Sequence, residues 1–333
     1  MNELNSFIYQ AAKGNNGFWL YLATILLVIF CYFLGGLPAG IVLAMRASEL
    51  NLDIQEVAQS VNPDVIQMDP GLVLFLFLLP FIAMLVMLWV CVTNFHKRPF
   101  ISLINGFTRV DWKKVGFSAL VWTLLAVLSE FVGYQLNPEN FTWNFQPTKF
   151  FSLLIVAILI LPLQTSAEEL FFRGYLMQGI GFISRKPWLG LLLTSVAFGL
   201  VHMANPEIAM YGQWLVSYYI GVGLLLGLIT LLDDGLEIAL GLHAANNIFG
   251  AVFVSFPGSA FQTPSLFIMG EFDASGMLLT WLVMASLFFL ILQKKYRWKK
   301  WDRVFATIEK REPIEATHMM EQLGKESNPL QED

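Results

Sequence analysis

The sequence predicts an all-α, polytopic membrane protein with about eight transmembrane helices, and three observations carry that prediction. Of the 333 residues, 56% are hydrophobic and only 14% are charged, whereas a soluble domain typically contains about 25% charged residues. The mean hydropathy of the chain is +0.61. Several apolar stretches also reach the length of about 20 residues that a helix needs to cross a bilayer.

Eight segments are apolar and long enough to be such helices. They lie at residues 18–45, 72–94, 114–135, 150–183, 188–204, 214–232, 237–256 and 276–293. We therefore expect an N-terminal segment at 1–17, a membrane domain at 18–293, and a basic-aromatic juxtamembrane segment followed by a polar, acidic tail at 294–333.

Basic residues predict the orientation of these helices. They are concentrated in three loops, as Lys97, Arg98, Arg109, Lys113 and Lys114, as Arg185 and Lys186, and as six residues between Lys294 and Arg303. If eight helices alternate, the three loops lie on one side, and loops rich in Lys and Arg face the cytoplasm. The sequence thus predicts that both termini are cytoplasmic.

The adjacent acids Glu168 and Glu169 lie in the apolar stretch 150–183. A charge at the centre of a membrane helix costs about 2.5–3.5 kcal/mol on insertion scales, so these acids indicate a water-containing site inside the bundle. Arg173 follows Glu169 by four residues, which places the two on one helix face where they can pair. His243 and Asn247 share a face in the same way, and Asn246 is turned away from it by about 100°.

The depths of these residues predict which of them meet. At about 1.5 Å per residue, Glu168 is roughly 27 Å along its helix from Lys186, and His202 is roughly 22 Å from Pro187 on the next helix. The same count puts His243 only about 10 Å from its cytoplasmic loop. The sequence therefore favours a Glu168–His202 pair and allows His243 to join it.

A carboxylate beside a neutral imidazole can hold and deprotonate a water molecule. A second imidazole and an amide can donate hydrogen bonds to a developing oxyanion. Together these groups describe a hydrolase that attacks an amide. Glu168, His202 and His243 could alternatively bind a divalent metal such as zinc, because two His and one Glu are a known catalytic ligand set, although the sequence contains no HExxH motif.

In their order along the chain, these residues resemble the motifs of the CPBP intramembrane proteases, the CAAX protease and bacteriocin-processing (Abi) family, which includes the type II CAAX prenyl endopeptidases. Glu168-Glu169-x-x-x-Arg173 matches EExxxR, Phe198-x-x-x-His202 matches FxxxH, and His243-x-x-x-Asn247 matches HxxxN. The motif region covers about 150–256 of the chain.

The resemblance implies an active-site cavity within the bundle and a role for each matching residue. Glu168 would be the base that activates water, His202 its partner, His243 and Asn247 the stabilisers of the oxyanion, and Glu169 with Arg173 a buried pair that orients the site. The family is commonly classed as metalloproteases, and a metal-independent glutamate mechanism is the alternative. We expect an integral protein of a bacterial cytoplasmic membrane that cleaves a membrane-anchored or hydrophobic peptide, in CAAX-type or bacteriocin-related processing, and we expect no nucleic-acid partner.

Other interpretations compete with this one. A proton-coupled transporter also keeps buried Glu and His, and a catalytically inactive family member could serve as an immunity protein or scaffold. Individually, Glu169 and Arg173 could be a structural ion pair, His202 a core histidine bonded to a backbone carbonyl, and His243 with Asn247 a polar contact between helices.

Overall fold

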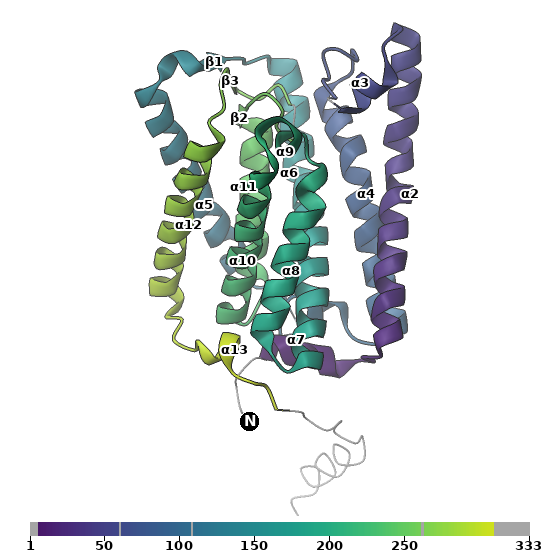
Figure 1. The fold of residues 1–333 in the computed structure, drawn as a ribbon, viewed down its shortest axis with the longest axis vertical. Coiled ribbons are helices and arrows are strands. Elements are labelled where there is room, and N and C mark those ends of the chain that lie inside the picture. Colours follow the sequence, from purple (N-terminus) through teal and green to yellow (C-terminus); the bar gives the residue numbers. More distant parts are fainter. Residues whose placement is uncertain (1–5, 60, 108, 261–262, 310–333) are drawn as a thin grey trace, which may run out of the picture.

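A computed structural model describes residues 6–59, 61–107, 109–260 and 263–309, which form an upright bundle of helices (Figure 1). The α-helices are α1 (Ser6–Tyr9), α2 (Phe18–Leu50), α3 (Ile54–Gln59), α4 (Pro70–Val90), α5 (Trp112–Leu136), α6 (Pro147–Glu169), α7 (Gln178–Ser184), α8 (Pro187–Val201), α9 (Pro206–Tyr211), α10 (Val216–Asp233), α11 (Glu237–Val252), α12 (Ala274–Tyr296) and α13 (Asp302–Phe305). The strands are β1 (Phe141–Trp143), β2 (Val254–Ser255) and β3 (Phe267–Met269).

The predicted membrane architecture is confirmed. Within the described residues, seven helices are long and apolar enough to cross a membrane. Each of them overlaps one of the predicted segments. The remaining segment, predicted at 237–256, forms α11, which has only 16 residues. The chain is therefore an all-α integral membrane protein.

Two predicted helices continue as π-helices rather than ending as α-helices. Cys91–Phe95 extends α4, and Leu170–Met177 joins α6 to α7, so that residues 147–184 form one continuous span. The span ends at Arg185, which adopts a left-handed conformation with φ of 60°. Pro187 then begins α8 at the position where proline is best tolerated in a helix. This tight turn is the one that the sequence predicts between the fourth and fifth segments.

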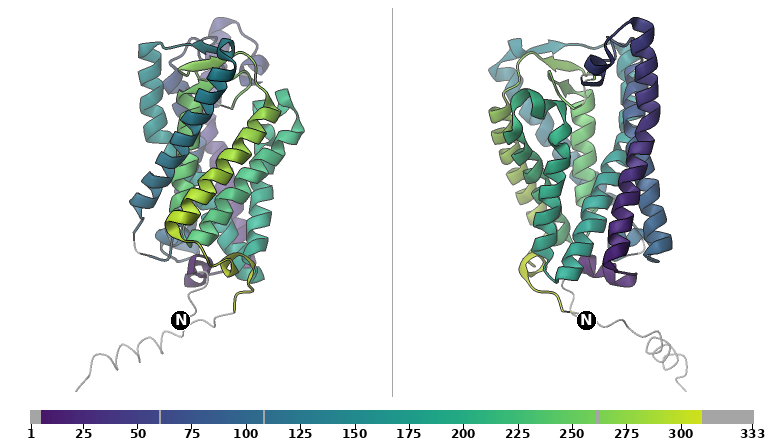
Figure 2. Two further views of the ribbon diagram at one scale, coloured as in Figure 1. Left: turned by 90° about the vertical axis from the view of Figure 1, so that its left-hand side faces the viewer. Right: turned by 45° about the vertical axis from the view of Figure 1, so that its right-hand side comes forward.

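Helix α11 lies inside the bundle, packed between α5 and α6, while α2 packs on α4, α4 on α6, and α8 on α10 (Figures 1 and 2). The close approach of α11 to α5 depends on Gly241. A Cβ atom at that position would lie 2.1 Å from Ser118 Oγ and 2.2 Å from the carbonyl oxygen of Val115. Gly250, on the same helix, has nothing within 4 Å of the equivalent point. Gly241 thus positions the half of α11 that carries His243.

A small sheet lies at one end of the bundle, and the first and last described residues lie at the opposite end (Figure 1). The sheet has the order β1-β3-β2, with β1 antiparallel and β2 parallel to β3, and the sequence pattern does not predict it. At the other end, the backbone N–H of Phe7 donates to Asp234 Oδ1 and that of Ile308 donates to the carbonyl of Arg185. The acidic tail expected from the sequence lies, from residue 310 onward, outside the described residues.

Candidate active site

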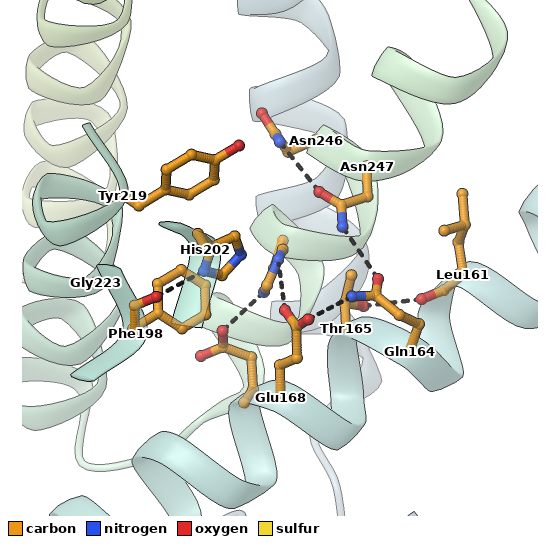
Figure 3. Close-up of polar contacts among 12 residues, drawn as sticks. Leu161, Gln164, Thr165, Glu168, Phe198, His202, Tyr219, Gly223, Asn246 and Asn247 are labelled. Atoms are coloured by element: carbon orange, nitrogen blue, oxygen red, sulfur yellow. Dashed lines mark hydrogen bonds and ion pairs between the residues drawn. The ribbon is translucent and has the colours of Figure 1, made fainter. Parts of the chain in front are cut away.

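Four of the six polar residues selected from the sequence line one cavity of about 650 Å³. Glu168 comes from the last turn of α6, His202 directly follows α8, and His243 and Asn247 come from successive turns of α11. Figure 3 shows Glu168, His202 and Asn247 arranged around a common space. Three helices that are separate in the sequence therefore present the candidate catalytic groups to one volume.

Glu169 and Arg173 form a fully buried ion pair behind this wall. Arg173 Nη1 donates to Glu169 Oε1 at 2.7 Å, and neither side chain is exposed. The guanidinium carbon also lies 4.4 Å from the ring centroid of Phe198, a cation–π geometry. The i, i+4 spacing predicted this pair, and the structure contains it.

The same carboxylate oxygen of Glu169 also orients His243. It lies 2.8 Å from His243 Nδ1, and because an ionised carboxylate only accepts hydrogen bonds, Nδ1 carries a proton. The other ring nitrogen, Nε2, lies 3.5 Å from Glu168 Oε2. The imidazole of His243 thus lies between the two adjacent acids, with Glu169 at Nδ1 and Glu168 at Nε2. The two acids therefore contact different atoms of the same ring.

This contact corrects the predicted pairing of Glu168. The depth count favoured His202 as its partner, but the structure places His243 against Glu168. One reason is the π-helix at Leu170–Met177, which rises less per residue than the α-helix assumed in the count, so that Glu168 is shallower than predicted. Another is that the first residue of α11, Glu237, is itself buried, with only 2% of its surface exposed. His243 therefore lies deeper in the bundle than the count from the loop predicts.

The ring of His202 is fixed by its surroundings. Nδ1 lies 2.6 Å from the carbonyl oxygen of Phe198, and because a carbonyl only accepts, this nitrogen is the protonated one and Nε2 is left as an acceptor. Tyr219 stacks on the imidazole with centroids 4.2 Å apart, and Phe198 lies at 4.4 Å. His202 thus makes the hydrogen bond to a backbone carbonyl that a core histidine would make, and its side chain also lines the cavity.

A directional chain of hydrogen bonds reaches Glu168 through Asn247 and three residues outside the motifs, and Figure 3 shows the chain from Asn246 onward. Trp122 Nε1 donates to Asn246 Oδ1 at 3.1 Å, Asn246 to Asn247 at 3.2 Å, Asn247 to Gln164 at 3.1 Å, and Gln164 to Glu168 Oε1 at 2.7 Å. An indole can only donate and a carboxylate only accepts, so the two ends fix the orientation of the three amides between them. Asn247 therefore keeps its second N–H for another acceptor, and Oε1 of Glu168 is engaged while Oε2 has no hydrogen-bond partner within the described residues.

The sequence could have revealed part of this chain. Gln164 precedes Glu168 by four residues, so the spacing that found Glu169 with Arg173 also applies to it. Asn246, which was expected to face away, contacts Asn247 and lines the cavity. Trp122 and Tyr219 come from distant segments, and no local spacing connects them to the site.

The three residues proposed as metal ligands were tested against the geometry. The described residues contain no group of three or more His, Cys, Asp or Glu side chains placed to hold a metal ion. The Nδ1 atoms of His243 and His202 bond to Glu169 and to a backbone carbonyl, which leaves Nε2 of each ring available, as in histidines that bind metals. The binding of a divalent metal by Glu168, His202 and His243 therefore stays a prediction.

Comparison with known proteins identifies the family of this chain. Residues 147–249, which contain all six candidate residues, match the family of type II CAAX prenyl endopeptidase Rce1-like proteins. The chain is also 31% identical over 269 residues to the uncharacterized protein YyaK of Bacillus subtilis, a match that covers 79% of this chain and 87% of that protein. The chain belongs to the Rce1-like family. No solved structure gives a significant match.

Membership in the Rce1-like family places the chain among CAAX-type intramembrane proteases. The matched range begins at the first residue of α6 and ends within α11. It therefore includes the three helices that carry the candidate site and excludes α2, α4, α5 and α12, which complete the bundle.

Proposed function

We propose that this Rce1-like protein hydrolyses a peptide bond near the membrane with a water molecule that Glu168 deprotonates. The observation that carries the proposal is the meeting of Glu168, His202, His243 and Asn247 at one cavity inside a membrane bundle. A carboxylate, an imidazole acceptor and two hydrogen-bond donors are the groups that attack by water requires.

In the proposed reaction, the water donates one hydrogen bond to Glu168 and the other to His202 Nε2. Glu168 Oε2 suits the first role because Gln164 engages the other oxygen. Nε2 of His202 suits the second because its Nδ1 proton is directed to the Phe198 carbonyl. Glu168 takes a proton from the water as the water oxygen attacks the carbonyl carbon of the peptide bond. Glu168 later gives that proton to the leaving nitrogen as the C–N bond breaks.

The negative charge that develops on the carbonyl oxygen is stabilised by Asn247 and His243. The free N–H of Asn247 can donate to this oxygen, because its other N–H goes to Gln164. His243 can donate from Nε2 only as an imidazolium, since its Nδ1 proton already goes to Glu169.

The cavity walls support a hydrophobic peptide or a lipid-anchored peptide as substrate. Aromatic side chains from six helices line it, including Tyr32, Phe81, Tyr218 and Trp281. CAAX-type cleavage and the processing of another membrane-bound peptide both fit such a surface. We further infer that the end of the bundle that holds α1 and α13 faces the cytoplasm of a bacterial cell, because the Arg185 turn and the basic segment after α12 lie at that end.

A cleavage assay tests the proposal. Purified wild-type protein, Glu168→Ala and the control Glu130→Gln, which changes an acid on α5 that does not line the cavity, are given a panel of membrane-anchored peptides. We expect cleavage by the wild type and the control, and none by Glu168→Ala. Equal processing by wild type and Glu168→Ala would end the protease proposal. Proton flux into liposomes that requires Glu168 would support the transporter instead.

A further inference from the structure

The cavity contains a second buried acid, Glu207, that the proposed reaction does not use. Glu207 is the second residue of α9, is only 6% exposed, and lines the cavity together with the catalytic groups. Its Oε1 accepts hydrogen bonds from the hydroxyl of Tyr219 and from Asn205 Nδ2. Because the Tyr219 ring also stacks on His202, Tyr219 connects Glu207 to one of the proposed catalytic groups.

Only neutral groups contact this carboxylate. Among the described residues, no Lys, Arg or His pairs with Glu207, and its Oε2 has no hydrogen-bond partner. Glu169, by contrast, is neutralised by Arg173. Burying an ionised carboxylate without a counter-charge is costly, so a cation that reaches Oε2 would stabilise Glu207.

The described lining of the cavity also contains no Lys or Arg that could pair with Glu207. The described lining residues include the acids Glu168 and Glu207. A substrate that placed a free carboxylate beside Glu207 would be repelled by that acid. A substrate with an ammonium or guanidinium group would supply the counter-charge that Glu207 lacks.

We propose that Glu207 is an acidic subsite that binds a cationic group of the substrate, either a Lys or Arg side chain or a free amino terminus. Tyr219 and Asn205 hold Oε1 in place, and Oε2 accepts a hydrogen bond from the bound cation. This inference rests on the proposed protease function, and it adds a substrate class: hydrophobic peptides that carry a positive charge near the bond to be cleaved.

Binding and cleavage are measured separately, so that the subsite and the protease function can fail independently. The binding probes are hydrophobic peptides that differ only in having Lys, Arg, norleucine or Glu at one position, scanned along the peptide, each with a free or an acetylated amino terminus. They are titrated into Glu168→Gln, in which Glu207 is the one remaining lining acid among the described residues, and into the double variant that also carries Glu207→Gln.

We expect one cationic form to bind Glu168→Gln about tenfold more tightly than its neutral counterpart, the size of a hydrogen bond to a charged group. The double variant should lose that preference, whereas adding Glu130→Gln to Glu168→Gln should preserve it. In the wild type, kcat/KM should show the same preference, and Glu207→Gln should remove it.

Equal binding of all cationic and neutral peptides to Glu168→Gln would overturn the subsite, as would a cationic preference that survives Glu207→Gln. These outcomes do not depend on cleavage. If the wild type binds cationic peptides through Glu207 and cleaves none of them, the subsite stands and the protease function fails.

Discussion

The neighbouring acids Glu168 and Glu169 differ in what their removal should cost, and two isosteric substitutions separate them. Glu169→Gln keeps the shape of the side chain and removes its charge, which leaves the fully buried Arg173 without its counter-ion. Loss of one partner of a buried ion pair typically costs about 3–5 kcal/mol. The Phe198 ring and the Gly223 carbonyl remain near the guanidinium, but both are uncharged.

Glu168→Gln should cost far less. The described partner of Glu168 Oε1 is Gln164 Nε2, which can donate equally well to an amide oxygen, so the expected loss is at most about 1 kcal/mol. The two variants should therefore differ by about 2–4 kcal/mol in the free energy of unfolding. For a protein of this size, such a difference corresponds to a fall in melting temperature on the order of 10 °C.

The assay is thermal unfolding of wild type, Glu168→Gln and Glu169→Gln in one detergent, together with the peptide cleavage rate of each. We expect Glu168→Gln to melt near the wild type and to be inactive, and Glu169→Gln to melt much lower and to lose activity as well, because His243 loses its charged acceptor. Adding Arg173→Met to Glu169→Gln removes the unpaired charge and should recover part of the stability. Equal melting temperatures for the two single variants would refute this division of roles.

Four further outcomes are expected. Gln164→Leu removes the donor to Glu168 and should lower kcat about ten- to a hundredfold with KM unchanged; a change in KM alone, measured on the same peptide, would contradict the positioning role. Gly241→Ala should destabilise the fold by about 1–3 kcal/mol because its Cβ would overlap α5, whereas Gly250→Ala on the same helix should melt like the wild type. Burial lowers the pKa of His96, so below about pH 6.5 the unfolded state binds more protons than the folded state does. The melting temperature should therefore fall as the pH drops below that value, and it should fall less steeply in His96→Gln than in wild type. Peptide cleavage should survive exhaustive treatment with a chelator, and loss of activity that added zinc restores would favour the metal mechanism.

The sequence predicted the helices well because crossing a membrane requires long apolar segments, and such segments are visible without tertiary information. The Arg185–Pro187 turn was predictable for a similar reason, since proline fixes the start of α8. The π-helix at Leu170–Met177 and the buried start of α11 were not, because both depend on packing between helices. The sheet of β1, β2 and β3 joins short segments from distant loops, and no alternating pattern marks them.

For the site, the sequence identified pairs within one helix and missed contacts between helices. Glu169 with Arg173 follows from spacing alone and is present in the structure. The contact of His243 with both acids could not follow from spacing, because it depends on the relative depths of α6 and α11. The same holds for Glu207, an acid outside the apolar segments that only the fold brings to the cavity.

The central claim is that water activated by Glu168 attacks the peptide bond directly, and isotope transfer in a single turnover tests it. Excess wild-type protein is mixed with a membrane-anchored peptide in heavy-oxygen water, and the product and the Glu168 side chain are examined by mass spectrometry. Direct attack predicts one heavy oxygen in the new carboxylate of the product and none in Glu168. An unlabelled product together with a labelled Glu168 would show that the glutamate itself attacked the carbonyl, and would contradict the account.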